Sequence, residues 1–341
     1  MVVVGILVLL AGVLSCSGCG GGSGPLPRHG LVFAHGASVT AEYDDALVEA
    51  GSGGGGLYLW RPRRRLERLA SAALLRDQPD WSPNGKLVAF TSTLCNDDPE
   101  CTAFPEVFVA RSDGSDQRRL TFPGGADELR STDPSWSPDS RRIAFATQFL
   151  PDFDSRLGIV SVTGGKIAWL RVSGWQPAWG KPGIAYLVQR RIRVPSDTDG
   201  YEYILAYTAI RLVNPSKRRS TTFASPPTGY HFESIAWSSR GELAAVDTGG
   251  SSSHRPTQLV ATYSATGRRL SQFGVPEALR TCGLTWTPEG ADLLLTVFPA
   301  RDARKRIGRA YPQLYTVDPS GEHWRRLSLG LGLTSCHVSW R

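Results

Sequence analysis

The chain has 341 residues, a formal net charge of +7, and hydrophobic residues at 41% of its positions. Beyond the N-terminal segment about 320 residues remain, which is enough for a large core, and no break in composition divides them, so we expect one domain. The positive charge comes mainly from arginine. No basic motif with interleaved aromatic residues accompanies it, so we expect no nucleic-acid partner.

Residues 1–24 are predicted to be an export segment with a Gly-rich linker. Residues 1–14 are nearly all apolar, but the run is too short for a comfortable transmembrane helix. The Ser-Gly-Cys sequence that follows resembles the cleavage box of bacterial lipoproteins, which implies a lipid anchor on Cys19 or, as a second candidate, on Cys16. An ordinary cleaved secretory signal or an uncleaved anchor remains the alternative. We therefore expect a bacterial, extracytoplasmic protein that is membrane-anchored in the cell envelope or secreted.

A module built around one tryptophan recurs along residues 28–341. The clearest copies are Trp-Ser-Pro-Asn-Gly from Trp81 and Trp-Ser-Pro-Asp-Ser from Trp136, each followed by a short apolar run. Ser-Pro-Asn/Asp-Gly is a tight-turn sequence, so each copy is predicted to be a β-hairpin. Its Trp offers a large flat surface for packing between neighbouring sheets. The predicted blade anchors are Trp81, Trp136, Trp179, Trp237, Trp286 and Trp340.

Two further short strands can be placed after each hairpin, which gives four strands per unit and predicts the blade of a β-propeller. The last unit has only its first strand, residues 336–340. The chain begins with strands at 31–34, 57–60 and 66–69 that lack a first strand. We therefore predict an all-β, six-bladed β-propeller with four antiparallel strands per blade, whose closing blade is made from both chain ends.

The pattern Trp-Ser-Pro-Asp-Gly-x-x-Ile-Ala-Phe resembles the TolB-like β-propeller family, the WD-like repeats of bacterial envelope proteins. The resemblance is strong in residues 81–90 and 136–145 and weaker in the other four copies, where Pro or Asp is lost. It implies a propeller fold and an envelope location. It implies no single activity, because propellers host many unrelated functions.

The connections between second and third strands are predicted to be long loops on one rim, at residues 36–56, 92–105, 148–156, 189–207, 247–257 and 299–312. Their charges are sorted into two halves. The acidic half holds Glu42, Asp44, Asp45, Glu49, Asp97, Asp98, Glu100, Asp152 and Asp154. The basic half holds the docking candidates Arg190, Arg191, Arg301, Arg304, Lys305 and Arg306, with Arg193 and Arg309. Such a rim would orient a protein partner or an envelope glycan on a monomeric propeller, unless these are simply solvated loop charges.

The innermost strands enter from the same rim, so residues three or four positions before each Trp are expected at the channel mouth. These binding candidates are Asp77, Gln78, Asp133, Gln176, Glu233 and His337. They could bind a metal or a small ligand, but a polar, water-filled channel is the more common outcome, and we expect neither a metal nor a cofactor.

The cysteines fit an exported protein. Cys95 and Cys101 lie in one predicted loop and are candidates for a short disulfide. Cys282 and Cys336 each lie four residues before their Trp, at equivalent places on adjacent blades. A disulfide there would link the closing blade to its neighbour if the two Cα atoms come close enough. Two buried free thiols are the alternative.

Catalytic motifs are absent from the sequence: it has no Gly-x-Ser-x-Gly elbow and no His-Glu-x-x-His. Residues 197–200, Asp-Thr-Asp-Gly, lack the Glu that would complete a calcium loop. The leading hypothesis is a non-enzymatic binding module. The alternative is a propeller enzyme, a hydrolase or lyase acting on sugar or peptide, with Asp77, Asp133, Glu233 and His337 at the channel mouth.

Overall fold

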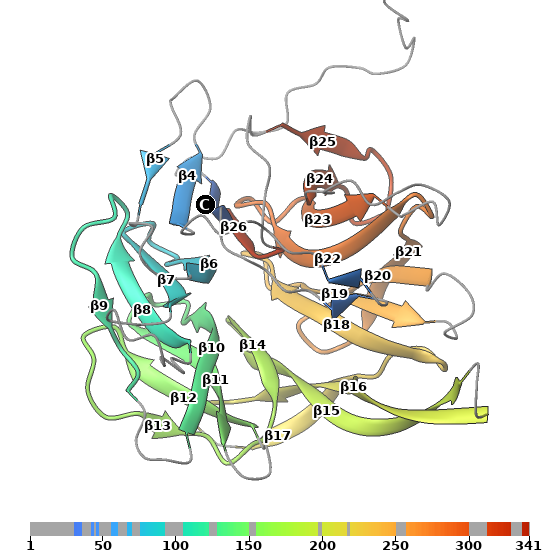
Figure 1. The fold of residues 1–341 in the computed structure, drawn as a ribbon, viewed down its shortest axis with the longest axis horizontal. Helices are drawn as coiled ribbons and strands as arrows, with labels where there is room; N and C mark the ends of the chain where they lie inside the picture. Colours follow the sequence, from blue (N-terminus) through green and yellow to red (C-terminus); the bar gives the residue numbers. More distant parts are fainter. Residues whose placement is uncertain are drawn as a thin grey trace, which may run out of the picture.

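The computed structural model describes residues 31–35, 42–43, 46–47, 56–60, 67–69, 76–92, 105–122, 128–149, 155–196, 200–216, 219–249, 257–299, 312–328 and 336–340. In these residues the fold is all-β, with four-stranded antiparallel sheets arranged around a central axis (Figure 1). No helix in this part of the chain has the length and hydropathy needed to cross a bilayer. The predicted export segment and both lipid-anchor candidates lie outside the described residues.

Each sheet is a blade whose first strand lies nearest the axis. The closing blade comprises β26 (Val338–Trp340), β1 (Leu31–His35), β4 (Gly56–Trp60) and β5 (Glu67–Arg68). The first blade comprises β6 (Arg76–Trp81), β7 (Leu87–Ser92), β8 (Glu106–Arg111) and β9 (Arg118–Arg119). The second comprises β10 (Glu128–Trp136), β11 (Arg142–Phe149), β12 (Ser155–Ser161) and β13 (Ala168–Trp169).

The other three blades follow in chain order. The third comprises β14 (Trp175–Gly180), β15 (Gly183–Ser196), β16 (Gly200–Val213) and β17 (Ser220–Ala224). The fourth comprises β18 (Tyr230–Trp237), β19 (Leu243–Gly249), β20 (Thr257–Tyr263) and β21 (Arg269–Gly274), and the fifth β22 (Leu279–Trp286), β23 (Leu293–Pro299), β24 (Gln313–Val317) and β25 (Arg325–Leu327). Two short strands, β2 (Glu42–Tyr43) and β3 (Ala46–Leu47), pair with each other.

The ring closes as the repeat pattern predicts. β26 pairs antiparallel with β1 through Leu31–Trp340, Val32–Ser339 and Phe33–Val338. Each inner strand also contacts the inner strand of the next blade, and β22 contacts β26, which returns the circuit to its start. The propeller and its closing blade, built from both ends of the chain, are therefore confirmed.

The core consists of separate apolar clusters between the faces of the blades. One cluster joins Ala89 and Val109 of the first blade to Ile143 and Phe145 of the second, with Trp136 between them. The Trp136 indole Nε1 donates a hydrogen bond over 2.9 Å to the backbone carbonyl of Asp80 in the preceding blade. Trp286 Nε1 makes the equivalent bond to Ala236 over 3.0 Å. A tryptophan can therefore fill the space between two sheets while satisfying its polar atom.

In the first and second blades the Ser-Pro turn is fixed by the serine that follows the anchor tryptophan. Ser137 Oγ accepts a hydrogen bond from the backbone N–H of Arg142 over 2.9 Å and donates to Asp139 Oδ1 over 2.5 Å. Asp139 Oδ1 also accepts from the backbone N–H of Arg141. Ser82 and Asn84 repeat this arrangement in the first blade. The repeated sequence therefore encodes both a hairpin turn and the anchor that positions it.

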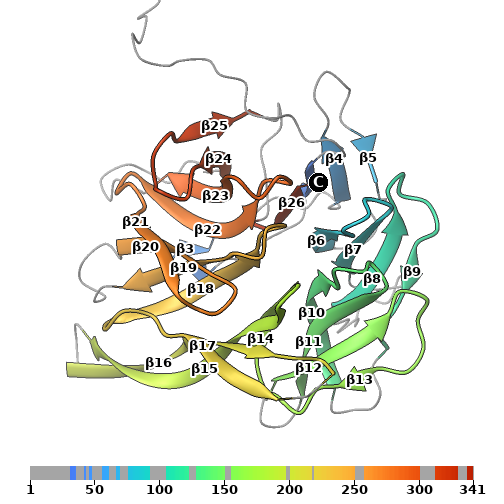
Figure 2. The same cartoon turned by 180° about the vertical axis from the view of Figure 1, so that it is seen from behind.

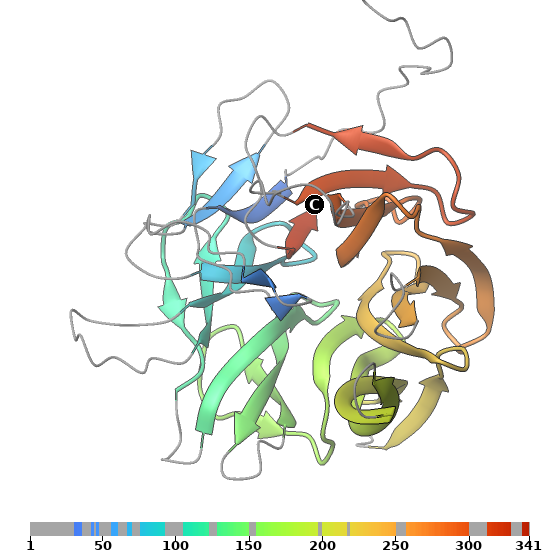
Figure 3. The same cartoon turned by 45° about the vertical axis from the view of Figure 1, so that its right-hand side comes forward.

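One connection differs from its prediction as a long loop. Residues 189–207 lie almost entirely in β15 and β16, which pair continuously from Gln189–Tyr207 to Ser196–Gly200. This hairpin projects beyond the ring in Figures 1 and 2 and points toward the viewer in Figure 3. At its base Tyr207 also pairs with Phe232 of β18, so the third and fourth blades share one hydrogen-bonded sheet. Arg190, Arg191 and Arg193 are therefore strand residues, not loop residues.

Candidate functional site

The inner strands bulge at the residues that sequence spacing places at the channel mouth. Gln78, Asp133 and Gln176 each lie three residues before the anchor Trp and directly before a proline. All three have a left-handed backbone, with φ of 50°, 55° and 47°. Strand pairing is interrupted at each of them. A bulge redirects a side chain out of the regular ladder, so these three positions are not arranged as in a regular pair of strands.

Three blades contribute to one polar group at this mouth. Gln78 Nε2 donates to Asp133 Oδ1 over 2.6 Å, and the backbone N–H of Asp133 donates to Gln78 Oε1 over 2.9 Å. The backbone N–H of Gln78 donates to Asp77 Oδ1, also over 2.6 Å. His337 Nδ1 lies 3.5 Å from the same Asp77 oxygen. The closing, first and second blades thus meet in a group of His337, Asp77, Gln78 and Asp133, the mouth group.

The mouth group contains an acid and a base whose proton affinities are both raised. Burial raises the pKa of Asp133, and it outweighs the opposing effects of the His337 charge and of the hydrogen bonds from Thr132 and the Gln176 backbone. For His337 burial lowers the pKa, but the carboxylates of Asp77 and Asp133 outweigh it, so its pKa is raised. The His337 side chain keeps 45% of its surface exposed. The His337 side chain is therefore accessible to solvent.

Glu233, the third predicted acid, belongs to a different hydrogen-bond network. Gln258 Nε2 donates to Glu233 Oε2 over 2.7 Å and also to the carbonyl of Thr281 over 2.9 Å. Burial raises the pKa of Glu233, opposed by hydrogen bonds from Thr248 and Gln258 and by the charge of Arg280. The Gln258 amide thus ties Glu233 to the fifth blade. The structure groups Asp77, Asp133 and His337, and it places Glu233 apart from them. Gln176 reaches the mouth group through its backbone.

Sequence spacing missed two residues beside the mouth group. Burial and the charge of Asp133 raise the pKa of Tyr207, and Arg130 opposes them, so all three side chains lie in one electrostatic neighbourhood. Arg130 has a sequence signal, because Arg130, His231 and Arg280 each lie six residues before their Trp. Tyr207 has none. It belongs to the third strand of its blade, and only the β16–β18 junction brings it to the channel.

Cys282 and Cys336 form a disulfide between the inner strands of the fifth and closing blades, with their Cα atoms 5.5 Å apart. Neighbouring inner strands come this close because Gly283 has no side chain. A Cβ there would collide with the carbonyl of Cys336. Cys336 directly precedes His337, so the disulfide fixes the backbone next to the mouth group.

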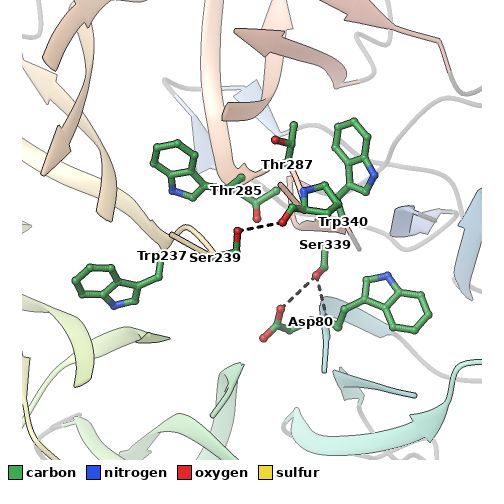
Figure 4. A pocket seen from close by; sticks show the side chains of 10 residues that line it. Asp80, Trp237, Ser239, Thr285, Thr287, Ser339 and Trp340 are labelled. Carbon is green, nitrogen blue, oxygen red and sulfur yellow. Dashed lines mark hydrogen bonds between the residues drawn. The ribbon is translucent and has the colours of Figure 1, made fainter. Parts of the chain in front are cut away.

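At the opposite end of the inner strands, polar side chains connect neighbouring blades. A small pocket of about 100 Å³ lies there, lined by polar side chains and the anchor tryptophans (Figure 4). Asp80 Oδ2 accepts the backbone N–H of Trp136, and Asp80 Oδ1 accepts the Ser339 hydroxyl over 3.2 Å. Ser339 Oγ in turn accepts the backbone N–H of Trp81. Because these polar atoms join three consecutive blades, we place the candidate site at the other mouth.

Among the described residues, one group of possible metal ligands lies together, at Asp318, Glu322 and His323. Its contacts are those of an exposed turn: Asp318 Oδ1 accepts the backbone N–H groups of Ser320 and Glu322, and Asp318 Oδ2 lies 2.7 Å from His323 Nδ1. Turn formation accounts for this arrangement.

Several sequence predictions fall outside the described residues. These are the loop pair Cys95 and Cys101, the lipid-anchor cysteines Cys16 and Cys19, the docking candidates Arg301, Arg304, Lys305 and Arg306, and the residues 197–199 of the Asp-Thr-Asp-Gly sequence. The side chains of the acidic half of the rim are outside them as well. The division of the rim by charge stays a prediction.

Comparison with known proteins supports the fold and corrects one prediction. No family model matches the chain. It is 30% identical over 114 residues to the uncharacterized peptidase YuxL of Bacillus subtilis (strain 168), and the aligned region covers 32% of this chain and 16% of that protein. The structure of a TolB protein from Agrobacterium tumefaciens has a TM-score of 0.55 at 14% identity, covering 81% of this chain and 89% of that one.

An oligogalacturonate lyase from Vibrio parahaemolyticus has a TM-score of 0.53 at 11% identity, with 80% of this chain and 71% of that one covered. Because the sequence relative is named a peptidase, the prediction that the chain is not an enzyme is contradicted. The absence of short catalytic motifs did not exclude an enzyme, because one fold can host many unrelated functions. The chain shares its fold with TolB-like β-propellers.

Proposed function

We propose that this propeller is an enzyme of the hydrolase or lyase class that acts on a sugar or peptide substrate at the channel mouth. The observation that carries the proposal is the mouth group, in which His337, Asp77, Gln78 and Asp133 from three blades are held together by hydrogen bonds and an ion pair. No single blade creates such a group. The peptidase name of the sequence relative supports an enzymatic role, although the relative is matched over 16% of its length.

The chemistry proposed is general acid–base catalysis. Proton transfer is most effective when a group titrates near the working pH, and the pKa of Asp133 and that of His337 are both raised. A carboxyl group with a raised pKa can hold a proton and donate it to a leaving group. Asp77 orients the His337 imidazole, which exchanges a proton with the substrate or with water. Gln78 fixes the Asp133 carboxyl through a short hydrogen bond.

The test compares turnover of a panel of oligosaccharides and chromogenic peptides by the wild type, D133N and H337Q. We expect either substitution to lower kcat by roughly a hundredfold or more on whichever substrate is turned over. The matched control is D116N, which makes the same chemical change on an exposed turn, at a residue whose positive φ of 53° asparagine tolerates. Full activity in both mouth variants would refute the proposed site. Absence of turnover across the panel would count against the enzymatic assignment.

We also propose that the domain works outside the cytoplasm. The Cys282–Cys336 disulfide supports this, because disulfides persist in oxidising compartments. Thiol alkylation of the native protein, followed by mass spectrometry, should find both cysteines protected until a reductant is added. Free thiols at both positions in protein taken directly from cells would contradict this location.

A further inference from the structure

One face of the β15–β16 hairpin carries arginine, aromatic and aliphatic side chains that the ring does not cover. The register pairs Arg191 with Leu205 and Arg193 with Tyr203. Since strand side chains alternate between faces, these four residues share one face, called here the hairpin face. Tyr203 is 60% exposed and Leu205 is 66% exposed. The Arg191 guanidinium lies 4.7 Å from the centroid of the Tyr203 ring.

The hairpin face leads to the mouth group. The same alternation continues to Gln189 and Tyr207, which pair with each other at the base of the hairpin. Tyr207 is half-buried, pairs with Phe232 of the fourth blade, and lies within the electrostatic influence of Asp133 and Arg130. A path of side chains thus runs from Arg193 and Tyr203 past Tyr207 toward the acid of the proposed site.

The side chains along this path favour an anion whose rings have apolar faces. Arginine forms paired hydrogen bonds to carboxylates and keeps its charge at every physiological pH. Tyr203 offers an apolar ring surface against which a sugar ring can lie. The net charge of +7 favours the approach of an anion. A bilayer surface is planar and cannot follow the hairpin into a channel mouth, whereas a chain-like molecule can lie along it and place one end there.

We infer that the hairpin face, together with Arg130, binds an acidic oligosaccharide, a chain of sugars that bear carboxylates, and directs one end of it to His337 and Asp133. Arg191 and Arg193 bind carboxylates along the chain, and Tyr203 packs against a ring between them. The delivery of the chain end to the mouth group rests on the proposed function. The binding itself does not.

The test measures affinity for oligogalacturonate by calorimetry on the full chain, with fully methyl-esterified oligogalacturonate as the neutral probe. All proteins carry D133N, so that turnover does not consume the ligand. The variant R191A/R193A removes two charges from the hairpin face. The control R171A/R268A removes two exposed charges from elsewhere, since Arg171 lies after β13 and Arg268 in the turn after β20.

We expect the R191A/R193A variant to bind oligogalacturonate at least tenfold more weakly, as the loss of charge-assisted hydrogen bonds requires. The control should keep its affinity, and the methyl ester should bind poorly to every protein. Equal affinities for the acidic and esterified probes, or equal losses in variant and control, would overturn the inference. So would anionic phospholipid vesicles that bind through Arg191 and Arg193 while oligogalacturonate does not.

The two proposals fail separately. Tight, charge-dependent binding to D133N, with no turnover by the protein that retains Asp133, would refute the proposed enzyme and leave the binding surface intact. Turnover of a neutral sugar or a peptide that R191A/R193A does not alter would keep the enzyme and refute the acidic substrate.

Discussion

Asp247 is a buried carboxylate that the fold leaves without a hydrogen bond. It lies on β19 at 0% exposure, and in the described part of the chain neither of its oxygens has a hydrogen-bond partner. Burial raises the pKa of Asp247 to about 7, the charge of Glu233 adds to the effect, and Arg269 opposes it. Buried carboxylates in apolar surroundings hold their proton in this way, because the charged form loses its hydration.

The pKa of Asp247 predicts how stability depends on pH. Because the folded pKa exceeds the unfolded value of about 4, the folded state binds the proton more tightly, and the free energy of unfolding decreases as pH rises from about 4 to about 7. Between pH 5 and pH 8 this group accounts for a loss of about 3 kcal/mol. D247N should lack that part of the decrease in urea titrations at the two pH values. An unchanged decrease in D247N, matching that of D116N, would contradict the assignment.

Gly180 accounts for one irregular copy of the repeat. It stands where four of the other five copies have serine or threonine after the Trp, and a Cβ there would lie 2.6 Å from Cγ of the Trp237 ring. G180A should therefore destabilise the protein by roughly 1–3 kcal/mol through overpacking. The control is G274A, where a Cβ would meet nothing within 4 Å. Thermal unfolding should separate the two variants, and equal midpoints would show that the Trp237 ring can move aside.

At the scale of the element, the β15–β16 hairpin shows where sequence reasoning was misled. Gln189 to Arg193 carry three arginines, and a dense run of charge indicates a solvated loop when only its polarity is considered. The alternation of these arginines with Ile192 and Val194 is nevertheless a strand pattern, and Ile192 lies opposite Ile204. The hairpin leaves the ring and buries little, so its hydrophobic signal is weak. The Arg191–Tyr203 contact, which helps to order the hairpin, joins residues of two different strands and cannot be recognised from the local sequence.

The other informative element is β26, which pairs with β1 over three residues. Its second attachment is the disulfide, which closes a loop with a sequence separation of 54. A loop of this length corresponds to about 4 kcal/mol of stability in the chain-entropy description. C282S/C336S should therefore unfold at a clearly lower temperature than the wild type.

Dithiothreitol provides the check on that prediction. It should lower the midpoint of the wild type to that of C282S/C336S and leave the variant itself unchanged. A large effect of reductant on the variant would place the stabilisation at another cysteine pair.

For the whole molecule, the ring could be predicted because one tryptophan recurs with its turn and its apolar strand. Copies too irregular to identify alone, such as that of Trp179, are supported by their neighbours. The closing blade followed from strands left without partners at both ends. The bulged backbone at Gln78, Asp133 and Gln176 was not predicted, although the spacing from each Trp located these residues at the mouth.

The parts of the site that could not be predicted depend on contacts between blades. Tyr207 comes close to Asp133 where β16 meets β18, and the spacing of the repeat does not show that Asp247 is fully buried. The positions of the two acids in the repeat do not show that Glu233 is hydrogen-bonded to Gln258, whereas Asp133 belongs to the mouth group. An activity was harder still to predict from the sequence, because propellers with the same ring serve unrelated functions.

The pairing of β1 with β26 also imposes an order of assembly. Among the described strands β1 comes first and β26 last in chain order, so the outer strands of the closing blade are synthesised long before its inner strand. Until β26 emerges, the inner edge of β1 is an open template for pairing with another chain. His337 arrives on that same late segment. The ring, its disulfide and the mouth group should therefore be completed together, once β26 has paired with β1.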